Sequence, residues 1–130
     1  MNNKLGKHYK LCSKIVIDSI FETGSTVRSH PFVARIKLIE SEDSTPFKIA
    51  FSAPKKIFRF AHERNRIKRI CKEAVRLNKT IIESYLQTQN KQLALFLIYA
   101  TKEELQHDEL HKSTTKLFQK IITKLEKHEL

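Results

Sequence analysis

The sequence has 130 residues, of which 40% are hydrophobic and 30% are charged. This length predicts one domain with one core, and this composition excludes an intrinsically disordered chain. Twenty-five Lys and Arg against fourteen Asp and Glu give a net charge of +11. Such a charge predicts an anionic partner, nucleic acid first and an acidic membrane second, with charge kept only for solubility as the remaining explanation.

The cysteines and the hydropathy of the sequence argue against a secreted or membrane-spanning protein. Cys12 and Cys71 are far apart and form no CxxC, so neither a zinc ribbon nor a disulfide framework is indicated. The N-terminal stretch MNNKLGKHYKLCSK lacks the apolar segment of a signal peptide. The longest apolar run, Leu93 to Ala100, is shorter than the ~20 residues that cross a bilayer. We therefore expect a soluble cytoplasmic protein without a membrane partner.

The N-terminal part predicts a flexible arm and then a short helix. Residues 1–10 are basic and show no periodicity, so we expect them to be flexible. Ser13 is a suitable N-cap, and Gly24 is a suitable end for the helix. The residues expected to face inward are Val16, Ile17, Ile20 and Phe21.

Two alternating segments follow the first helix. Residues 32–39 and 47–53 both alternate apolar and polar side chains, which is typical of strands with one buried face. The polar stretch SEDSTP lies between them. The segments therefore predict a β-hairpin.

The second half predicts helix, strand and helix. A basic connection, PKKIFRFAHE, follows Pro54 and leads into a helix from about Glu63 to Asn78, with a weaker helical extension to Leu86. The run LALFLIYA at 93–100 is typical of a strand that is covered on both faces. An amphipathic helix begins at about Asp108. The order of elements predicts an α+β sandwich with helices packed on a mixed sheet.

The central helix contains the stretch HERNRIKRICKEAVR, in which core spacing and high charge coincide. Between positions 55 and 79 there are ten basic and two acidic residues, so this segment supplies +8 of the net +11. A projection at 100° per residue separates two faces. One face carries Ile67, Ile70, Cys71, Ala74 and Val75, and the other carries Asn65, Lys68, Arg69, Lys72, Arg76 and Lys79.

The polar face of this helix indicates a nucleic-acid partner. Like charges at i, i+4, such as Lys68 and Lys72, destabilise an isolated helix by a few tenths of a kcal/mol (~0.2–0.5). Bound phosphates would remove that repulsion. Arg offers a planar fork to phosphate and Asn offers a donor and an acceptor, so Arg64, Asn65 and Arg66 suit RNA backbone and base edges better than a lipid surface.

Other functions stay open at this point. The polar face of this helix could hold structured RNA in a ribosomal protein. The helix could instead lie in a DNA major groove, or belong to a membrane-surface or regulatory protein. No catalytic motif is present: HERNR has Arg66 where HExxH needs its second His, and GxSxG and the P-loop are absent. We interpret His107 and His111 as a surface pair and predict no metal-binding residues.

The run RNRIKRICKEAVR, preceded by SAPKK, resembles the RNR motif of the bacterial ribonuclease P protein subunit. The helix ending IFETG, the following GSTV, the Phe-Val strand start and the apolar strand before the last helix agree with that family. The resemblance covers roughly residues 11 to 125.

The resemblance implies a fold and an activity. The fold is α+β: a two-layer α/β sandwich with a mixed four-stranded sheet, a left-handed βαβ crossover and a ribosomal-protein-like topology. The left-handed unit would consist of strand 47–53, the basic helix and strand 93–100. The protein would be a monomer within a ribonucleoprotein that removes the 5′ leader from precursor tRNA. Catalysis would belong to ribonuclease P RNA, with Mg²⁺ acting in the RNA active site, so the protein itself would supply no catalytic residue.

The resemblance also implies two sets of binding residues. The residues expected to bind the catalytic RNA are Lys55, Lys56, Arg64, Asn65, Arg66, Lys68, Arg69, Lys72 and Arg76. The residues expected to bind the leader, in a cleft between the first helix and the sheet, are Ile17, Phe21 and Arg35. Ile17 and Arg35 replace family aromatics, and for Phe21 a core role and a leader contact are both open. The cognate RNA and the role of Phe58, Arg59 and Phe60 also stay open.

Overall fold

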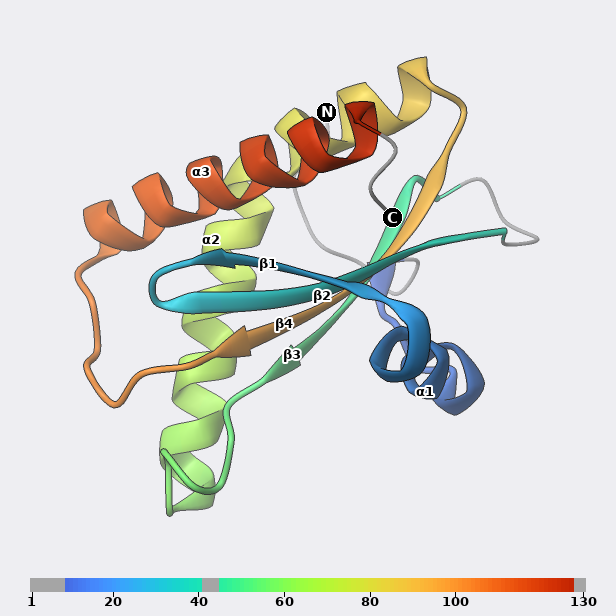
Figure 1. Ribbon diagram of the computed structural model, residues 1–130. Helices are drawn as coiled ribbons and strands as arrows, with labels where there is room; N and C mark the ends of the chain where they lie inside the picture. The colour runs from blue at the N-terminus through green and yellow to red at the C-terminus, as the bar shows by residue number, and fades with distance from the viewer. Residues whose placement is uncertain (1–8, 41–44, 128–130) are drawn as a thin grey trace.

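The computed structural model describes residues 9–40 and 45–127. This part of the chain forms three helices and four strands (Figure 1). They are α1 (Lys14–Thr23), β1 (Ser25–Ser29), β2 (Phe32–Ile39), β3 (Phe47–Ser52), α2 (Ala61–Thr88), β4 (Gln92–Tyr99) and α3 (His107–Glu126). The linker expected at SEDSTP falls largely on positions 41–44, outside the described residues.

The strands form one mixed sheet in the order β1-β2-β4-β3. β2 pairs antiparallel with both β1 and β4, while β3 pairs parallel with β4, with Phe47 opposite Leu93. β3, α2 and β4 therefore make the expected βαβ unit of adjacent parallel strands. The left hand of this crossover stays a prediction.

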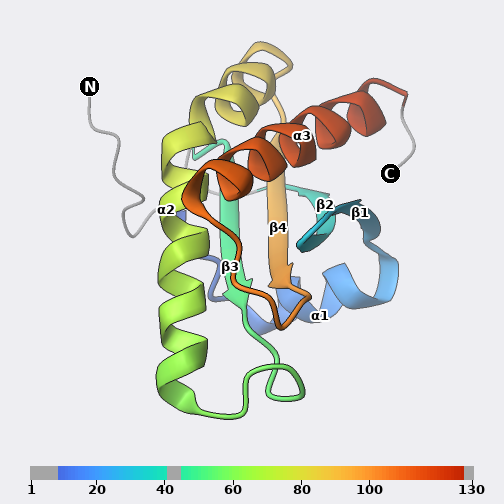
Figure 2. The same ribbon diagram turned by 90° about the vertical axis from the view of Figure 1, so that its left-hand side faces the viewer.

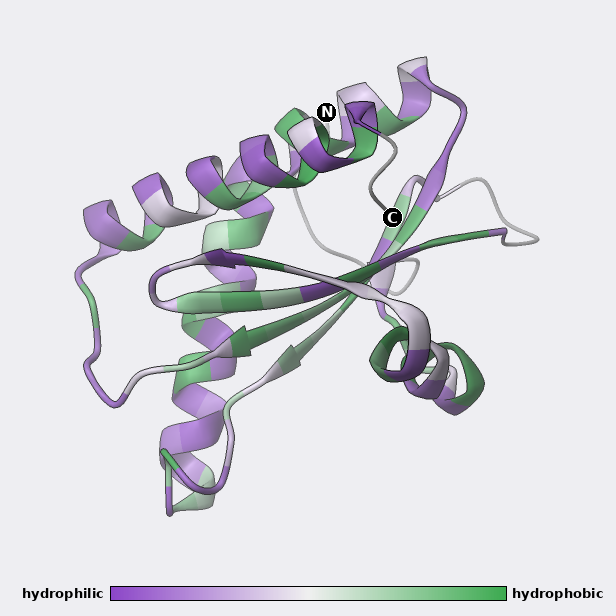
Figure 3. Ribbon diagram, in the orientation of Figure 1, coloured by the Kyte–Doolittle hydropathy of each residue, from purple (hydrophilic) through white to green (hydrophobic). Residues whose placement is uncertain are grey.

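The helices cover the two faces of the sheet unequally. Leu93, Leu95 and Leu97 of β4 face the main core with α2 and α3, and Figure 2 shows these two helices on the same side of the sheet. The opposite face carries a smaller cluster around Leu11, Ile20 and Ala94, which is covered by α1. Figure 3 shows hydrophobic residues along the central strands. β4 is thus apolar on both faces, as LALFLIYA predicts.

Local signals explain the helix boundaries. The Ser13 side chain accepts a hydrogen bond from the Val16 amide at 3.3 Å, which confirms Ser13 as the N-cap of α1. α2 runs without a break for 28 residues, so the expected extension to Leu86 is confirmed and belongs to the same helix, which continues to Thr88. After the C-cap Gln89, Asn90 has a left-handed φ of 54°, and the Lys91 amide donates to the Leu86 carbonyl at 2.9 Å. This hydrogen bond is typical of a Schellman motif, whose left-handed position is most often Gly and sometimes Asn.

The predicted hairpin between residues 32–39 and 47–53 is wrong. β4 lies between these two strands, because its two apolar faces need the centre of the sheet. The real hairpin joins β1 to β2, with Ser29 opposite Phe32. β1, with the sequence STVRS, is short and largely polar, so its periodicity did not predict a strand; the fourth strand entered the prediction only through the family resemblance.

The chain before α1 is anchored at Tyr9 and Lys10. Residues 1–8 of the expected flexible arm lie outside the described residues, but the expectation is wrong for these two positions. The Tyr9 ring lies 5.1 Å from that of Phe47, its hydroxyl donates to the Glu83 carboxylate, and the Lys79 ammonium lies 4.9 Å from its ring centroid. Lys10 forms a parallel bridge with Ile49. This segment therefore covers one side of α2.

This anchor predicts a pH dependence of stability. Burial, and then the Glu83 carboxylate, raise the pKa of Tyr9 from 10.0 to about 12. The neutral phenol therefore contributes stability that is fully present below pH 10 and is lost as the pH rises through about 12. We expect the free energy of unfolding of Tyr9→Phe to fall less over this interval than that of the unmodified chain. A difference absorbance titration in which Tyr9 ionises near pH 10 would contradict the contact.

Candidate nucleic-acid interface

The polar face of α2 is held in place by its buried face. Ile67, Cys71 and Val75 are at most 3% exposed and face the main core, as predicted. Burial raises the pKa of the Cys71 thiol to about 12, so this cysteine is a core residue rather than a nucleophile. The cations on the other face are therefore displayed by a rigid helix.

Four predicted residues form the exposed α2 stripe, which we define as Asn65, Lys68, Arg69 and Lys72. Among the described residues, the three cations of this stripe form no ion pair. Lys55 and Lys56 are also exposed, in the turn that the Ile57 and Phe58 amides close on the Pro54 carbonyl. This turn leads directly into α2. The stripe and the lysine pair thus supply positive charge available to a polyanion.

Other predicted RNA-binding residues have internal partners. The Arg64 Nη1 donates to the carbonyls of Phe58 and Arg59, both at 3.0 Å, so Arg64 ties the connection to the start of α2. Arg76 pairs with Glu73 at 2.5 Å, and its hydrogen bond lowers the pKa of that carboxyl. Their charges are less available than those of the stripe.

Lys79 is not on the exposed face, contrary to the projection. Lys79 is only 6% exposed because the Tyr9 segment covers this side of α2. The polar face is therefore exposed only along the N-terminal half of the helix and up to Arg76.

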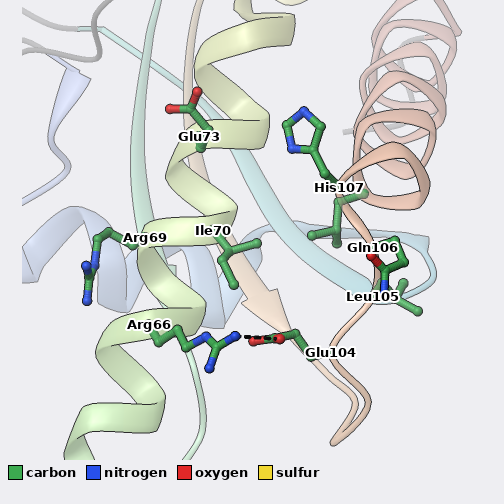
Figure 4. Close-up of a pocket in the computed structure, with 9 residues that line it drawn as sticks. Arg66, Arg69, Ile70, Glu73, Glu104, Leu105, Gln106 and His107 are labelled. Atoms are coloured by element: carbon green, nitrogen blue, oxygen red, sulfur yellow. Dashed lines mark hydrogen bonds and ion pairs between the residues drawn. The ribbon is translucent and has the colours of Figure 1, made fainter.

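Arg66 borders a groove between α2 and the start of α3. It forms a 2.9 Å ion pair with Glu104, which Figure 4 shows reaching across from α2. The groove has a volume of about 570 Å³, and Ile70 and Leu105 supply apolar lining. Two arginines, Arg66 and Arg69, and two glutamates, Glu73 and Glu104, line the groove. Its net charge is therefore close to zero, whereas the stripe is positive.

The connection before α2 has both a buried and an exposed aromatic residue. Phe58 is 5% exposed and packs 5.9 Å from the Tyr99 ring, so it belongs to the core. Phe60 is 56% exposed, stacks on His62 and lies under the Arg59 guanidinium. The sequence had left these roles open, since spacing in an irregular connection does not predict which side chain turns inward.

The three predicted leader residues lie together at α1 and the sheet. Ile17 packs half-buried on the smaller cluster. Phe21 is 47% exposed, so the expected inward position is wrong. Its ring packs edge-to-face with the Phe96 ring, with the two ring centroids 4.9 Å apart. The Arg35 guanidinium lies 5.6 Å from the Phe21 ring and donates to the carbonyls of Ile20 and Phe21 at 3.0 Å. Arg35 therefore caps the C-terminal end of α1 as well as adding charge there.

Two residues of this surface were missed from the sequence. Phe96 was assigned to a strand covered on both faces, but it is only half-buried and lies opposite Arg35 in the β2–β4 register. Lys37 donates to the side chains of Ser19 and Thr23. The alternation of β2 contains the signal, because Arg35 and Lys37 must share one face of that strand.

The described part of the chain offers no metal-binding cluster and no membrane-spanning helix. Residues 9–40 and 45–127 contain no cluster of three or more His, Cys, Asp or Glu able to hold a metal ion. His107 and His111 are both exposed, and His111 Nδ1 lies 3.1 Å from the Asn78 amide nitrogen. In the same ranges, none of the helices has both the length and the hydropathy to span a bilayer.

Comparison with known proteins decides the family. The family model described as Ribonuclease P matches residues 5–122. The chain belongs to the ribonuclease P protein family. Relatives named ribonuclease P protein component, from two strains of Porphyromonas gingivalis, are 32% identical over 97 residues. The match covers 75% of this chain and 66% of each relative.

Solved structures of ribonuclease P proteins share the fold. The protein from Staphylococcus aureus matches with a TM-score of 0.65 and 18% identity, over 87% of this chain and 94% of its own. The protein from Thermotoga maritima matches with a TM-score of 0.68 and 20% identity, over 85% and 96%. These matches confirm the α+β architecture with its mixed sheet.

Proposed function

We propose that this chain is the protein subunit of ribonuclease P, the ribonucleoprotein that removes the 5′ leader from precursor tRNA. The observation that carries the proposal is the exposed α2 stripe, fixed by a buried face, in a chain that matches the ribonuclease P family over residues 5–122. The phosphodiester chemistry belongs to the RNA, with Mg²⁺ acting in the RNA active site. The protein supplies binding surfaces and charge.

The α2 stripe and the lysine pair at Lys55 and Lys56 hold the catalytic RNA. Their cations neutralise phosphates, so binding releases counterions and depends on salt. Asn65 adds a donor and an acceptor for a base edge or a 2′-hydroxyl. Arg66 can join this surface by exchanging Glu104 for a phosphate, because both partners of that pair are well exposed, at 66% and 41%.

The surface at α1 holds the single-stranded leader. Phe21 offers an exposed ring for base stacking, Ile17 offers apolar area, and Arg35 holds positive charge beside the ring. Phe96 and Lys37 extend the same surface across the sheet. The two surfaces together place positive charge where the catalytic RNA and its substrate meet.

Reconstitution tests the proposal. Ribonuclease P RNA alone and with the full chain is assayed for precursor-tRNA cleavage at low Mg²⁺, and stimulation by the protein is expected. No stimulation, with RNA binding retained, would instead indicate an RNA-binding module without a processing role.

Phe21→Ala separates leader binding from folding. Base stacking on an aromatic side chain contributes ~1–3 kcal/mol, so the reconstituted enzyme should bind leader-bearing precursor roughly 5- to 100-fold more weakly. Affinity for mature tRNA should not change. Phe60→Ala is the matched control, because Phe60 is similarly exposed but lies at the start of α2. Equal losses for precursor and mature tRNA, or an unfolded Phe21→Ala chain, would make Phe21 a structural residue.

A further inference from the structure

A second positive surface lies on α3 and is not part of the surfaces described above. Between Leu110 and Leu125 the sequence has four lysines, at positions 112, 116, 120 and 124, and no Asp or Glu. The acidic residues of α3 are confined to its two ends, at Asp108, Glu109 and Glu126. The middle of this helix therefore carries charge of one sign.

Helix geometry gathers three of these lysines on one face. At 100° per residue, Lys112, Lys116 and Lys120 fall within ~80° of one another, opposite the buried side of the helix. All three are exposed, whereas Leu117, Phe118 and Ile121 are fully buried in the main core. We call Lys112, Lys116 and Lys120 the α3 lysine face.

The α3 lysine face is attached firmly to the sheet. The Lys120 ammonium donates to the Arg28 carbonyl of β1 at 2.8 Å, which fixes this lysine to the edge strand of the sheet. Ser113 donates to the His30 carbonyl at 2.7 Å and accepts from Ser29 at 3.1 Å. Lys116 and Lys120 border a shallow depression of about 300 Å³ that also contains Gln119 and Thr123. The helix that carries the three lysines is thus fixed to the β1–β2 hairpin.

The chemistry of this face fits RNA backbone. Among the described residues, Lys112 and Lys116 form no ion pair or hydrogen bond through their side chains. Lysine presents a point charge without the planar fork of arginine, which suits phosphates rather than base edges. A membrane-surface helix needs a free apolar side, and the apolar side of α3 is occupied by the core.

We propose that the α3 lysine face is a second RNA-binding surface that contacts the phosphate backbone without reading sequence. Figure 2 shows α3 extending from the middle of α2 toward β1, away from the N-terminal half of α2 that carries the exposed stripe. The two surfaces can therefore engage different segments of RNA. This inference deepens the proposed function, with either the catalytic RNA or precursor tRNA as the source of the phosphates.

The test variant is Lys112→Gln/Lys116→Gln, which leaves the Lys120 hydrogen bond intact. The matched control is Lys91→Gln/Lys102→Gln, which removes the same charge from the two loops that flank β4. Binding to a plain RNA duplex is measured over a salt titration. The binding constant falls as salt rises, and for duplex DNA each phosphate contact adds about 0.9 to the steepness of log K against log salt. The slope of the test variant should therefore be shallower by roughly 1.5–2, and that of the control should change much less.

Two further measurements locate the contact. A reduced slope for ribonuclease P RNA alone assigns the face to the catalytic RNA, and a reduced slope only for precursor tRNA bound to the holoenzyme assigns it to the substrate. Equal slopes for the test variant and the control in all three RNA measurements would overturn the inference. Binding to anionic lipid vesicles is measured as well, and a variant that loses vesicle binding while its RNA binding is unchanged would also overturn it. If the unmodified chain fails to stimulate cleavage while the duplex difference remains, the proposed function fails and this inference stands.

Discussion

Lys68→Gln/Lys72→Gln should weaken binding of ribonuclease P RNA by at least about tenfold at moderate salt, because each phosphate contact carries a slope of ~0.9 in log K against log salt. Both side chains are exposed and, among the described residues, form no ion pair. Their repulsion at i, i+4 is relieved in the variant, so its stability should be unchanged or slightly higher. RNA binding over a salt titration and urea unfolding together measure both effects.

The control for this variant is Lys91→Gln/Lys102→Gln, which has the same net charge. Arg64→Ala would be a poorer test, because it also frees the Phe58 and Arg59 carbonyls and disturbs the entry to α2. Arg76→Ala would leave Glu73 unpaired on the same helix. If the test variant and the control lose the same affinity, the protein binds RNA through its overall field and not through the α2 stripe.

Gly24→Ala should lower the free energy of unfolding by roughly 2–4 kcal/mol, at or above the usual range for overpacking. A Cβ at this position would lie 2.3 Å from the Ile20 carbonyl oxygen and 2.8 Å from that of Ile36. Both atoms belong to the backbone, so residue 24 would have to move away from the last turn of α1 and from β2 at the same time. The φ of Gly24 is an ordinary −75°, and close approach is therefore the reason for glycine here.

Urea unfolding measures this effect, with Glu22→Ala as the control. Glu22 is exposed on α1 and its loss should change stability by no more than about 0.5 kcal/mol. Because Arg35 and Phe21 meet at this end of α1, the Gly24 variant should also bind leader-bearing precursor more weakly. A variant as stable as the unmodified chain would show that α1 and β2 do not approach this closely.

Several elements were predictable because their signals are local. Ser13 begins α1 and Gly24 ends it, each through a hydrogen bond that spans only three or four residues. The core face of α2 followed from helical spacing at Ile67, Cys71 and Val75. The short, polar β1 has no such signal, and it is a strand only because β2 lies beside it.

The candidate binding residues divide in the same way. The sequence predicted which cations share a face of α2, but it did not predict that Tyr9 covers Lys79 or that Arg64 holds the connection. Those contacts join residues from separate elements or from an irregular segment. The predicted leader residues show a similar limit, since Arg35 caps α1 from a strand that lies beyond β1 in the chain.

The sequence by itself determined the composition of each face: an apolar and a cationic side of α2, a strand apolar on both faces at 93–100, and an excess of positive charge. Only the tertiary structure decided that β4 separates β2 from β3, and which of the predicted RNA-binding cations are exposed and which are paired within the protein. The physical reason is that periodicity reports burial within one element. Strand order and the pairing of charges depend on contacts between elements that are far apart in the chain.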